Sequence, residues 1–219
     1  MIYFALACFA FGVALSFFSA YLLFRIRTRS RDLNWITLYI IINGMFEIAS
    51  GFLASSKTAN IGLVSLLTPL EIILIGFTVA PWLKKPKPAF VRLVSLIFVA
   101  GFLLARLMGW EGLALNELNS TSRIIEVFLL VLLCIFGLRD GWEEHTGSFF
   151  RHYQTWFLGG ILVYSFAAIA VFGAFETDTA QTRTVLASIN VIFNAIKYLA
   201  FAVSLVLLKR AHSGPVAAT

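Results

Sequence analysis

Polar and ionisable side chains recur at helical spacing within long apolar stretches of this sequence. An asparagine and a glutamate four residues apart begin the pattern near residue 43, and later stretches repeat it. Intervals of three and four residues place such side chains on one face of a helix. Carboxylate, amide and ammonium groups gathered on facing helices can bind a small polar ligand or couple protons. The candidate ligand-binding residues are Asn43, Glu47, Thr68, Glu71, Glu126, Tyr164, Asn190, Asn194 and Lys197.

The composition indicates that these helices lie in lipid. Of the 219 residues, 60% are hydrophobic and only 13% are charged. A soluble domain carries about 45–50% apolar and about 25% charged residues. An apolar excess with so few charges is typical of a chain whose solvent is the bilayer. We therefore predict an all-α integral membrane protein.

Seven segments are long enough to cross the hydrocarbon core of a bilayer, which needs about 20 apolar residues. Only helices can do this within a bundle, because backbone groups in lipid must be paired within the segment. We expect residues 1–210 to form one seven-helix domain and 211–219 a short cytoplasmic tail. The predicted spans are 3–24, 34–54, 61–83, 90–109, 122–139, 154–175 and 184–208.

The basic residues predict the orientation of these spans. Twelve fall on one side and four on the other, a positive-inside bias that places the N-terminus outside and the C-terminus inside. The net charge of +6 then reflects topology and contact with anionic lipid, and we expect no nucleic-acid partner. The twelve are Arg25, Arg27, Arg29, Arg31, Lys84, Lys85, Lys87, Arg92, Arg139, Arg151, Lys209 and Arg210, and the four are Lys57, Arg106, Arg123 and Arg183.

The candidate residues gather in the outer half of the predicted bundle. At 1.5 Å per residue, Glu126 lies about 7 Å below the outer boundary, Glu47 and Glu71 about 12–15 Å, and Lys197 about 20 Å. Three carboxylates against one lysine leave charge uncompensated, which favours a protonated acid or a hydrated cavity that accepts a ligand. The alternative is a purely structural network, in which Lys197 neutralises one glutamate and the asparagines bond across helices.

The sequence carries no recognisable catalytic or metal site. His145, His152 and His212 all lie outside the predicted spans, and no zinc-binding spacing appears. No GxSxG, HExxH or phosphate-binding motif is present. Cys8 and Cys134 lie in apolar stretches without CxxC spacing. We expect no catalytic residue, no metal and no cofactor, and an intramembrane enzyme is a remote alternative.

A lysine in the seventh span raises a second remote alternative, a retinal protein. The positions that would carry the helix-seven aspartate, the helix-three counterion and the arginine of microbial rhodopsins are here Phe193, Leu63 and Asn60. We therefore expect no chromophore on Lys197.

Four motifs combine aromatic and carboxylate positions along nearly the whole chain. They are residues 44–48 (GMFEI), 67–71 (LTPLE), 153–157 (YQTWF) with Gly159 and Tyr164, and 189–197 (INVIFNAIK). In these motifs the chain resembles a group of uncharacterised bacterial seven-helix proteins whose genes often neighbour sensor histidine kinases. The resemblance implies a sensory role in the bacterial cytoplasmic membrane, and it supplies no catalytic residues.

Two classes of function remain open for such a bundle. In a sensor or receptor-like subunit, a ligand from outside would bind the polar cluster and bias two packings of the helices. The loops at 84–92 and 140–153 would then report to a cytoplasmic or membrane partner. A transporter of small molecules or ions would use the same cluster as a midplane site. The inner halves of the spans are almost wholly apolar, which favours the sensor.

Overall fold

The computed structural model describes residues 2–25, 31–55, 61–110, 120–144, 147–174 and 180–213. These residues form seven α-helices and two 3₁₀ turns, with no strand among them. The expected all-helical fold is therefore confirmed for this part of the chain. The elements are α1 (Ile2–Arg25), α2 (Arg31–Ser55), α3 (Ile61–Val79), η1 (Ala80–Trp82), α4 (Pro88–Leu107), α5 (Ser120–Glu144), η2 (Phe149–Arg151), α6 (Tyr153–Ala174) and α7 (Ala180–Ser213).

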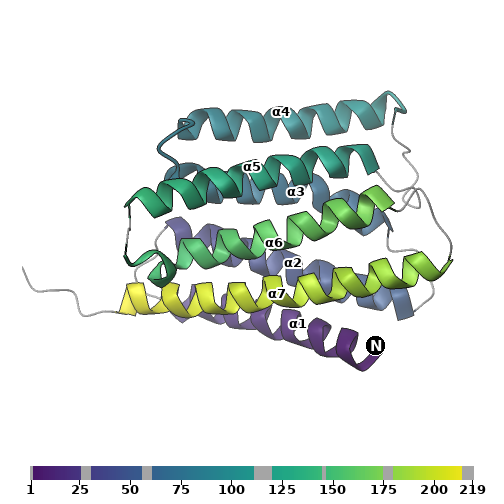
Figure 1. The fold of residues 1–219 in the computed structure, drawn as a ribbon, viewed down its shortest axis with the longest axis horizontal. Coiled ribbons are helices and arrows are strands. Elements are labelled where there is room, and N and C mark those ends of the chain that lie inside the picture. Colours follow the sequence, from purple (N-terminus) through teal and green to yellow (C-terminus); the bar gives the residue numbers. More distant parts are fainter. Residues whose placement is uncertain are drawn as a thin grey trace, which may run out of the picture.

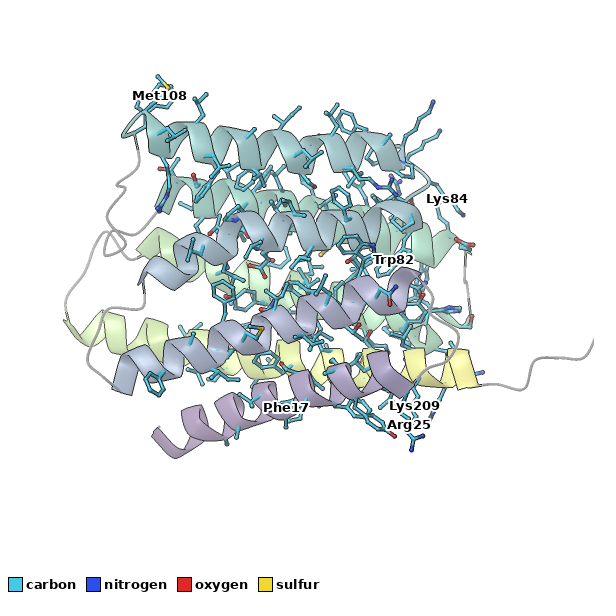
Figure 2. The ribbon with its side chains drawn as sticks, turned by 180° about the vertical axis from the view of Figure 1, so that it is seen from behind. Phe17, Arg25, Trp82, Lys84, Met108 and Lys209 are labelled. Carbon is cyan, nitrogen blue, oxygen red and sulfur yellow. The ribbon has the colours of Figure 1, made fainter. Side chains whose placement is uncertain are left out.

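The helices run side by side as a bundle (Figure 1). The most extensive packing joins α6 to α7, α1 to α2 and α5 to α6. At one edge α4 packs mainly on α3 and η1, and at the opposite edge α1 packs on α2 and α7. The three labelled cations Arg25, Lys84 and Lys209 lie at one end of the bundle and Met108 at the other (Figure 2). We call the end with the three cations the basic end.

Local sequence accounts for the ends of two helices. The turn η1 follows α3 directly and has Pro81 at its start, where the missing backbone N–H costs no helical hydrogen bond. After the turn, α4 begins with Pro88 as its first residue. It ends just before Gly109, whose φ of +71° lies in the left-handed region that glycine reaches without a Cβ clash.

Three helical segments are long and apolar enough to cross a membrane: Pro88–Leu107, Thr121–Glu144 and Val191–Ala211. Shorter apolar helices, Ala10–Leu22, Leu66–Trp82 and Tyr153–Ile169, accompany them among the described residues. Large apolar side chains also cover the outside of the bundle. Soluble proteins rarely expose so much contiguous apolar surface. Exposed examples are Phe17, Phe52, Leu93, Ile97, Leu103, Leu107, Phe128, Phe166 and Leu199.

Small residues let neighbouring helices approach closely. A Cβ added to Gly44 on α2 would lie 1.7 Å from the hydroxyl oxygen of Ser16, which donates a hydrogen bond to the Ile40 carbonyl across the α1–α2 interface. A Cβ on Gly160 of α6 would lie 2.9 Å from the Cβ of Ala200 on α7. Small residues at helix crossings permit close van der Waals packing, which drives the association of helices in lipid.

A buried aromatic layer fills the bundle toward its basic end. The ring of Tyr39 packs edge-on against Phe157 and Phe201, each at 5.7 Å between centroids. Trp82 contacts Phe157 at 6.0 Å and Tyr153 at 6.2 Å. Tyr39, Phe157 and Phe201 are fully buried, and their rings contact one another between α2, α6 and α7.

Candidate functional site

A buried group of charged side chains joins α2, α3 and α5. The Glu71 carboxylate accepts a hydrogen bond of 2.6 Å from the Tyr39 hydroxyl and one of 2.9 Å from Nη1 of Arg123. The same Nη1 also pairs with Oε2 of Glu126, three residues further along α5. Arg123, Glu71 and Glu126 are only 2%, 1% and 0% exposed, so their charges must be balanced within the group.

Helical spacing positions these side chains. Arg123 and Glu126 are three residues apart near the start of α5 and therefore share one face of that helix. On α3, buried Thr68 lies three residues before Glu71 on the face that meets α5. The neighbouring Pro69 lies inside α3 and is half-buried. The arrangement is a carboxylate pair bridged by one guanidinium.

A second group centres on Lys197 of α7. Its Nζ lies 4.0 Å from the ring centroid of Tyr164 on α6 and 5.1 Å from that of Tyr198. Lys197 is only 3% exposed, and within the described residues no carboxylate lies within 4.0 Å of its Nζ. Tyr198 donates a hydrogen bond of 2.8 Å to Glu47 on α2. Aromatic rings thus provide the close contacts of this buried cation.

Tyr164 connects the two groups, because it interacts with Arg123 as well as with Lys197. The electrostatic field of Lys197 also reaches Glu71 and Glu47. The two groups therefore form one site across α2, α3, α5, α6 and α7. We call it the charged cluster and define it as Glu47, Glu71, Arg123, Glu126, Tyr164 and Lys197.

Among the buried side-chain oxygens that have no hydrogen-bond partner within the described residues, three are near the charged cluster. They are Oε1 of Glu126, Oγ of Ser165 and Oδ1 of Asn194. A buried polar group without a partner costs about 1–3 kcal/mol, so each such group in a folded protein requires an explanation. Two acceptors and a hydroxyl at this level of the bundle are groups to which a polar ligand can bond.

The structure brings most of the predicted site residues together. Glu71, Glu126, Tyr164 and Lys197 lie in the charged cluster, with Glu47 attached through Tyr198. Thr68 is buried one turn from Glu71. Asn43 is buried, and its amide donates to the Tyr39 carbonyl of its own helix at 3.2 Å. Asn194 is described above, and the side chain of Asn190 lies outside the described residues.

Arg123 is the functional residue that sequence reasoning placed differently. The charge asymmetry places it at a helix end, among the four basic residues of the outer side, whereas the structure buries it between two glutamates. Three carboxylates therefore face two buried cations, Arg123 and Lys197, and the stoichiometric argument for uncompensated charge is weaker than expected. The three-residue interval between Arg123 and Glu126 was the available signal for an ion pair within the helix.

Three cavities in the described part of the chain lie away from the charged cluster. One of about 210 Å³ opens near Trp82, Glu144 and Gln154 at the basic end. A second, of about 320 Å³, lies between α6 and α7 beside Trp156. A third, of about 110 Å³, lies between α3, α4 and α5. A cavity that opens from the outside onto the charged cluster stays a prediction.

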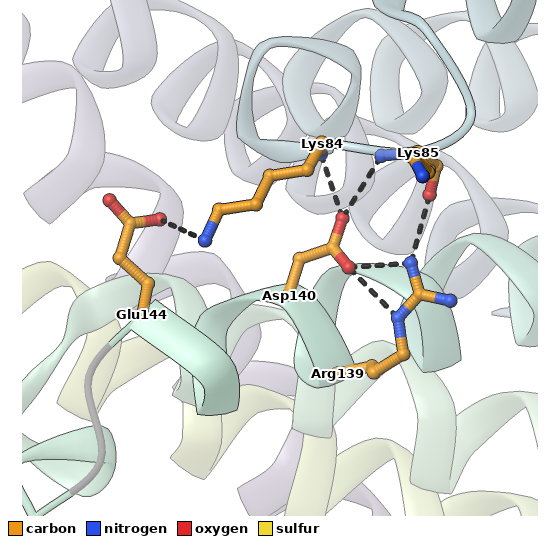
Figure 3. A network of polar contacts seen from close by, with 5 residues as sticks. All are labelled: Lys84, Lys85, Arg139, Asp140 and Glu144. Atoms are coloured by element: carbon orange, nitrogen blue, oxygen red, sulfur yellow. Dashed lines mark hydrogen bonds and ion pairs between the residues drawn. The ribbon is translucent and has the colours of Figure 1, made fainter.

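The basic end holds a separate polar network (Figure 3). Asp140 accepts hydrogen bonds from the backbone N–H of Lys84 at 2.7 Å and of Lys85 at 3.4 Å. Its other oxygen accepts two from Arg139, at 2.9 and 2.6 Å, and Arg139 also donates to the Lys85 carbonyl. Lys84 pairs with Glu144 at 3.9 Å. This network ties the turn between η1 and α4 to the end of α5.

Within the described residues, no group of three or more histidine, cysteine, aspartate or glutamate side chains could hold a metal ion. Cys134 is buried in the apolar core of α5. Comparison of the chain with protein-family profiles, with curated proteins and with solved structures found no match.

Proposed function

We propose that this chain is a seven-helix membrane sensor. A small polar ligand from outside binds at the charged cluster, and the basic end, on the cytoplasmic side, reports to a signalling partner. The N-terminus lies outside and the C-terminus inside a bacterial cytoplasmic membrane. Each part of the proposal rests on a separate feature of the molecule.

The membrane placement is supported by the apolar helices and by where the cations gather. Three segments are long and apolar enough to span, and shorter apolar helices pack among them. Arg25 lies on α1, Lys84 in the turn before α4, and Lys209 on α7. All three nevertheless lie at one end of the bundle (Figure 2). A cluster of cations at one end is what the positive-inside rule expects of the cytoplasmic side.

The charged cluster is the single observation that carries the sensory function. It joins five helices through groups whose burial is costly, and Lys197 lies against two tyrosine rings with no ion pair among the described residues. A ligand that bonds to Lys197 or to the unpaired oxygens of Glu126 and Asn194 would change the balance of forces between α5, α6 and α7. Ionisable groups inside a membrane bundle usually mark a functional site.

The aromatic layer favours a sensor over a transporter. On α6, Phe157 is seven residues nearer the basic end than Tyr164, a distance of about 10 Å along the helix. On α7, Phe201 is four residues beyond Lys197 in the same direction. A substrate that left the charged cluster for the inside would have to pass the packed rings of Tyr39, Phe157 and Phe201.

The same layer offers a route for the signal. Tyr39 donates a hydrogen bond to Glu71 through its hydroxyl and packs its ring on Phe157. Phe157 in turn contacts Trp82, the last residue of η1. A displacement of Glu71 would therefore be transmitted to the segment at 84–92. Asp140 connects that segment to the segment at 140–153, because it accepts hydrogen bonds from the backbone of Lys84 and Lys85. A cytoplasmic kinase is the partner that the resemblance suggests.

Ligand-dependent thermal stabilisation tests the proposal. Purified protein in detergent is melted with a panel of small carboxylates, amines and amino acids. We expect at least one to raise the Tm of the wild type and not that of Lys197→Met or Asn194→Ala. Leu199→Met, at an exposed position on the same helix, is the matched control and should keep the shift.

Two results would reject the sensor. A panel that leaves the wild-type Tm unchanged, or a shift that survives in both site variants, would show that the charged cluster does not bind these ligands. Accumulation of the stabilising compound in proteoliposomes would instead identify a transporter.

A further inference from the structure

An apolar groove lies between α4 and α5 with α3 as its floor. Its volume is about 110 Å³. Ser95 is its one hydroxyl-bearing residue, and that hydroxyl is already bonded to the Val91 carbonyl at 3.0 Å. The groove therefore offers no free side-chain donor to an occupant, and the rest of its lining is apolar. Its lining includes Pro86, Val94, Ser95, Leu129, Leu132 and Phe136.

The way in which α4 is attached explains why the groove exists. On the α3 side the two helices are in close contact, since a Cβ on Gly76 would lie 2.1 Å from the Ser95 hydroxyl. On the other side α4 has no comparable contact with α5, because it packs mainly on α3 and η1. The half-buried side chains of Val94, Leu129 and Leu132 therefore line a slot. From Leu129 to Phe136 the slot runs for about 10 Å along α5.

The end of the groove at Pro86 lies in a segment that is rich in basic residues. The segment from 84 to 92 carries Lys84, Lys85, Lys87 and Arg92 and no acidic residue. Lys85 and Lys87 are exposed. The nearby acids are largely compensated, because Asp140 is bonded to Arg139 and to two backbone N–H groups, and Glu144 is paired with Lys84. Glu143 is exposed on the last turn of α5.

We propose that this groove is a binding site for an anionic phospholipid of the cytoplasmic leaflet. One acyl chain lies in the slot between α4 and α5, and the phosphate of the headgroup lies against Lys85 and Lys87. The apolar lining selects a hydrocarbon chain and the cations select a negative headgroup, so charge complementarity identifies the occupant. The inference rests on the proposed membrane placement and is independent of the ligand at the charged cluster.

Native mass spectrometry of the protein released from nanodiscs tests this site. The nanodiscs contain equal amounts of phosphatidylglycerol and phosphatidylcholine with the same acyl chains. We expect the wild type to retain phosphatidylglycerol preferentially. The double variant Lys85→Gln, Lys87→Gln should lose this preference by about fivefold for each lysine removed, because a lysine near an anionic surface contributes about that much.

Matched controls separate a site from general attraction. Lys209→Gln with Arg210→Gln removes the same charge at the same end but on α7, and it should leave the preference unchanged. Val94→Trp, or Leu132→Trp from the α5 side, should fill the slot and abolish retention of both lipids. Leu96→Trp, on the exposed face of α4, should retain them.

The proposal is overturned by equal retention of the two lipids, or by a preference that Val94→Trp and Leu132→Trp both leave intact. Recovery of the wild type in the soluble fraction instead of in membranes would reject the membrane placement itself. The two failures are thus distinguishable.

Discussion

Arg123 changes the charge balance of the charged cluster more than any other residue. It bonds Glu71 and Glu126 through one nitrogen, whereas Lys197 lies against the ring of Tyr164 and forms no ion pair among the described residues. Arg123 therefore stabilises the fold, and the proposed ligand would bind at Lys197. The two roles can be separated by measuring how strongly each cation is coupled to Glu71.

Replacing Arg123 with methionine should lower the free energy of unfolding by about 3–5 kcal/mol, because two buried carboxylates lose their partner. In the double variant with Glu71→Gln much of this loss should be recovered. The coupling between the two positions should exceed about 2 kcal/mol, near the upper part of the range for contacting residues. Unfolding in detergent, monitored by circular dichroism, gives the stabilities of the wild type, the two single variants and the double variant, from which the coupling is calculated.

The matched cycle uses Lys197→Met in place of Arg123→Met. Since no described carboxylate lies within 4.0 Å of Nζ, the coupling of Lys197 to Glu71 should be clearly smaller than the coupling of Arg123 to Glu71. A coupling as large as that of Arg123 would show that Lys197 is a structural partner of Glu71. It would also weaken the ligand-binding interpretation.

Helix packing offers two positions on α6 that differ sharply in their surroundings. A Cβ on Gly160 would lie 2.9 Å from the Cβ of Ala200 and 3.2 Å from the backbone oxygen of Lys197, while a Cβ on Gly159 would meet nothing within 4 Å. Gly160→Ala should therefore force α6 and α7 apart and cost about 1–3 kcal/mol. Gly159→Ala should be neutral or slightly stabilising, because alanine favours the helix.

Thermal melting of the two alanine variants side by side checks this prediction. Equal Tm values would mean that α6 and α7 are not in close contact at Gly160. A loss of ligand-dependent stabilisation in Gly160→Ala alone would further connect this interface to the site at Lys197.

The basic-end network gives a second prediction about elements. Asp140→Ala removes the acceptor of two backbone N–H groups and the partner of Arg139, so the turn between η1 and α4 should loosen from α5. We expect a loss of about 1–3 kcal/mol and faster tryptic cleavage after Lys84. Glu144→Gln is the control, because an exposed pair at 3.9 Å contributes about 0–1 kcal/mol. Similar proteolysis of both variants would contradict the role of Asp140.

The whole molecule is tested by its topology. Met108 and Lys209 lie at opposite ends of the bundle (Figure 2), and both are exposed. With Cys8 and Cys134 replaced by alanine, Met108→Cys should react with an impermeant maleimide added to intact cells. Lys209→Cys should react only after the cells are opened. Labelling of both positions from outside would reject the proposed arrangement of spans.

Much of the fold could be predicted from the sequence because helix formation in apolar segments is local. Stretches of about 20 apolar residues, ended by basic or glycine- and proline-containing segments, correspond to the seven helices of the described residues. Spacing along each helix also identified which polar residues share a face, as with Thr68 and Glu71.

The sequence alone therefore determined the helices, their polar faces and the asymmetry of basic charge. Only the tertiary structure decided which faces meet. The choice of Arg123 as the partner of Glu71, and of tyrosine rings as the contacts of Lys197, depends on the rotation of α3, α5, α6 and α7 about their axes. That rotation is set by the packing of many side chains at once, including the close approach at Gly160. The spacing of residues along a single helix does not specify it.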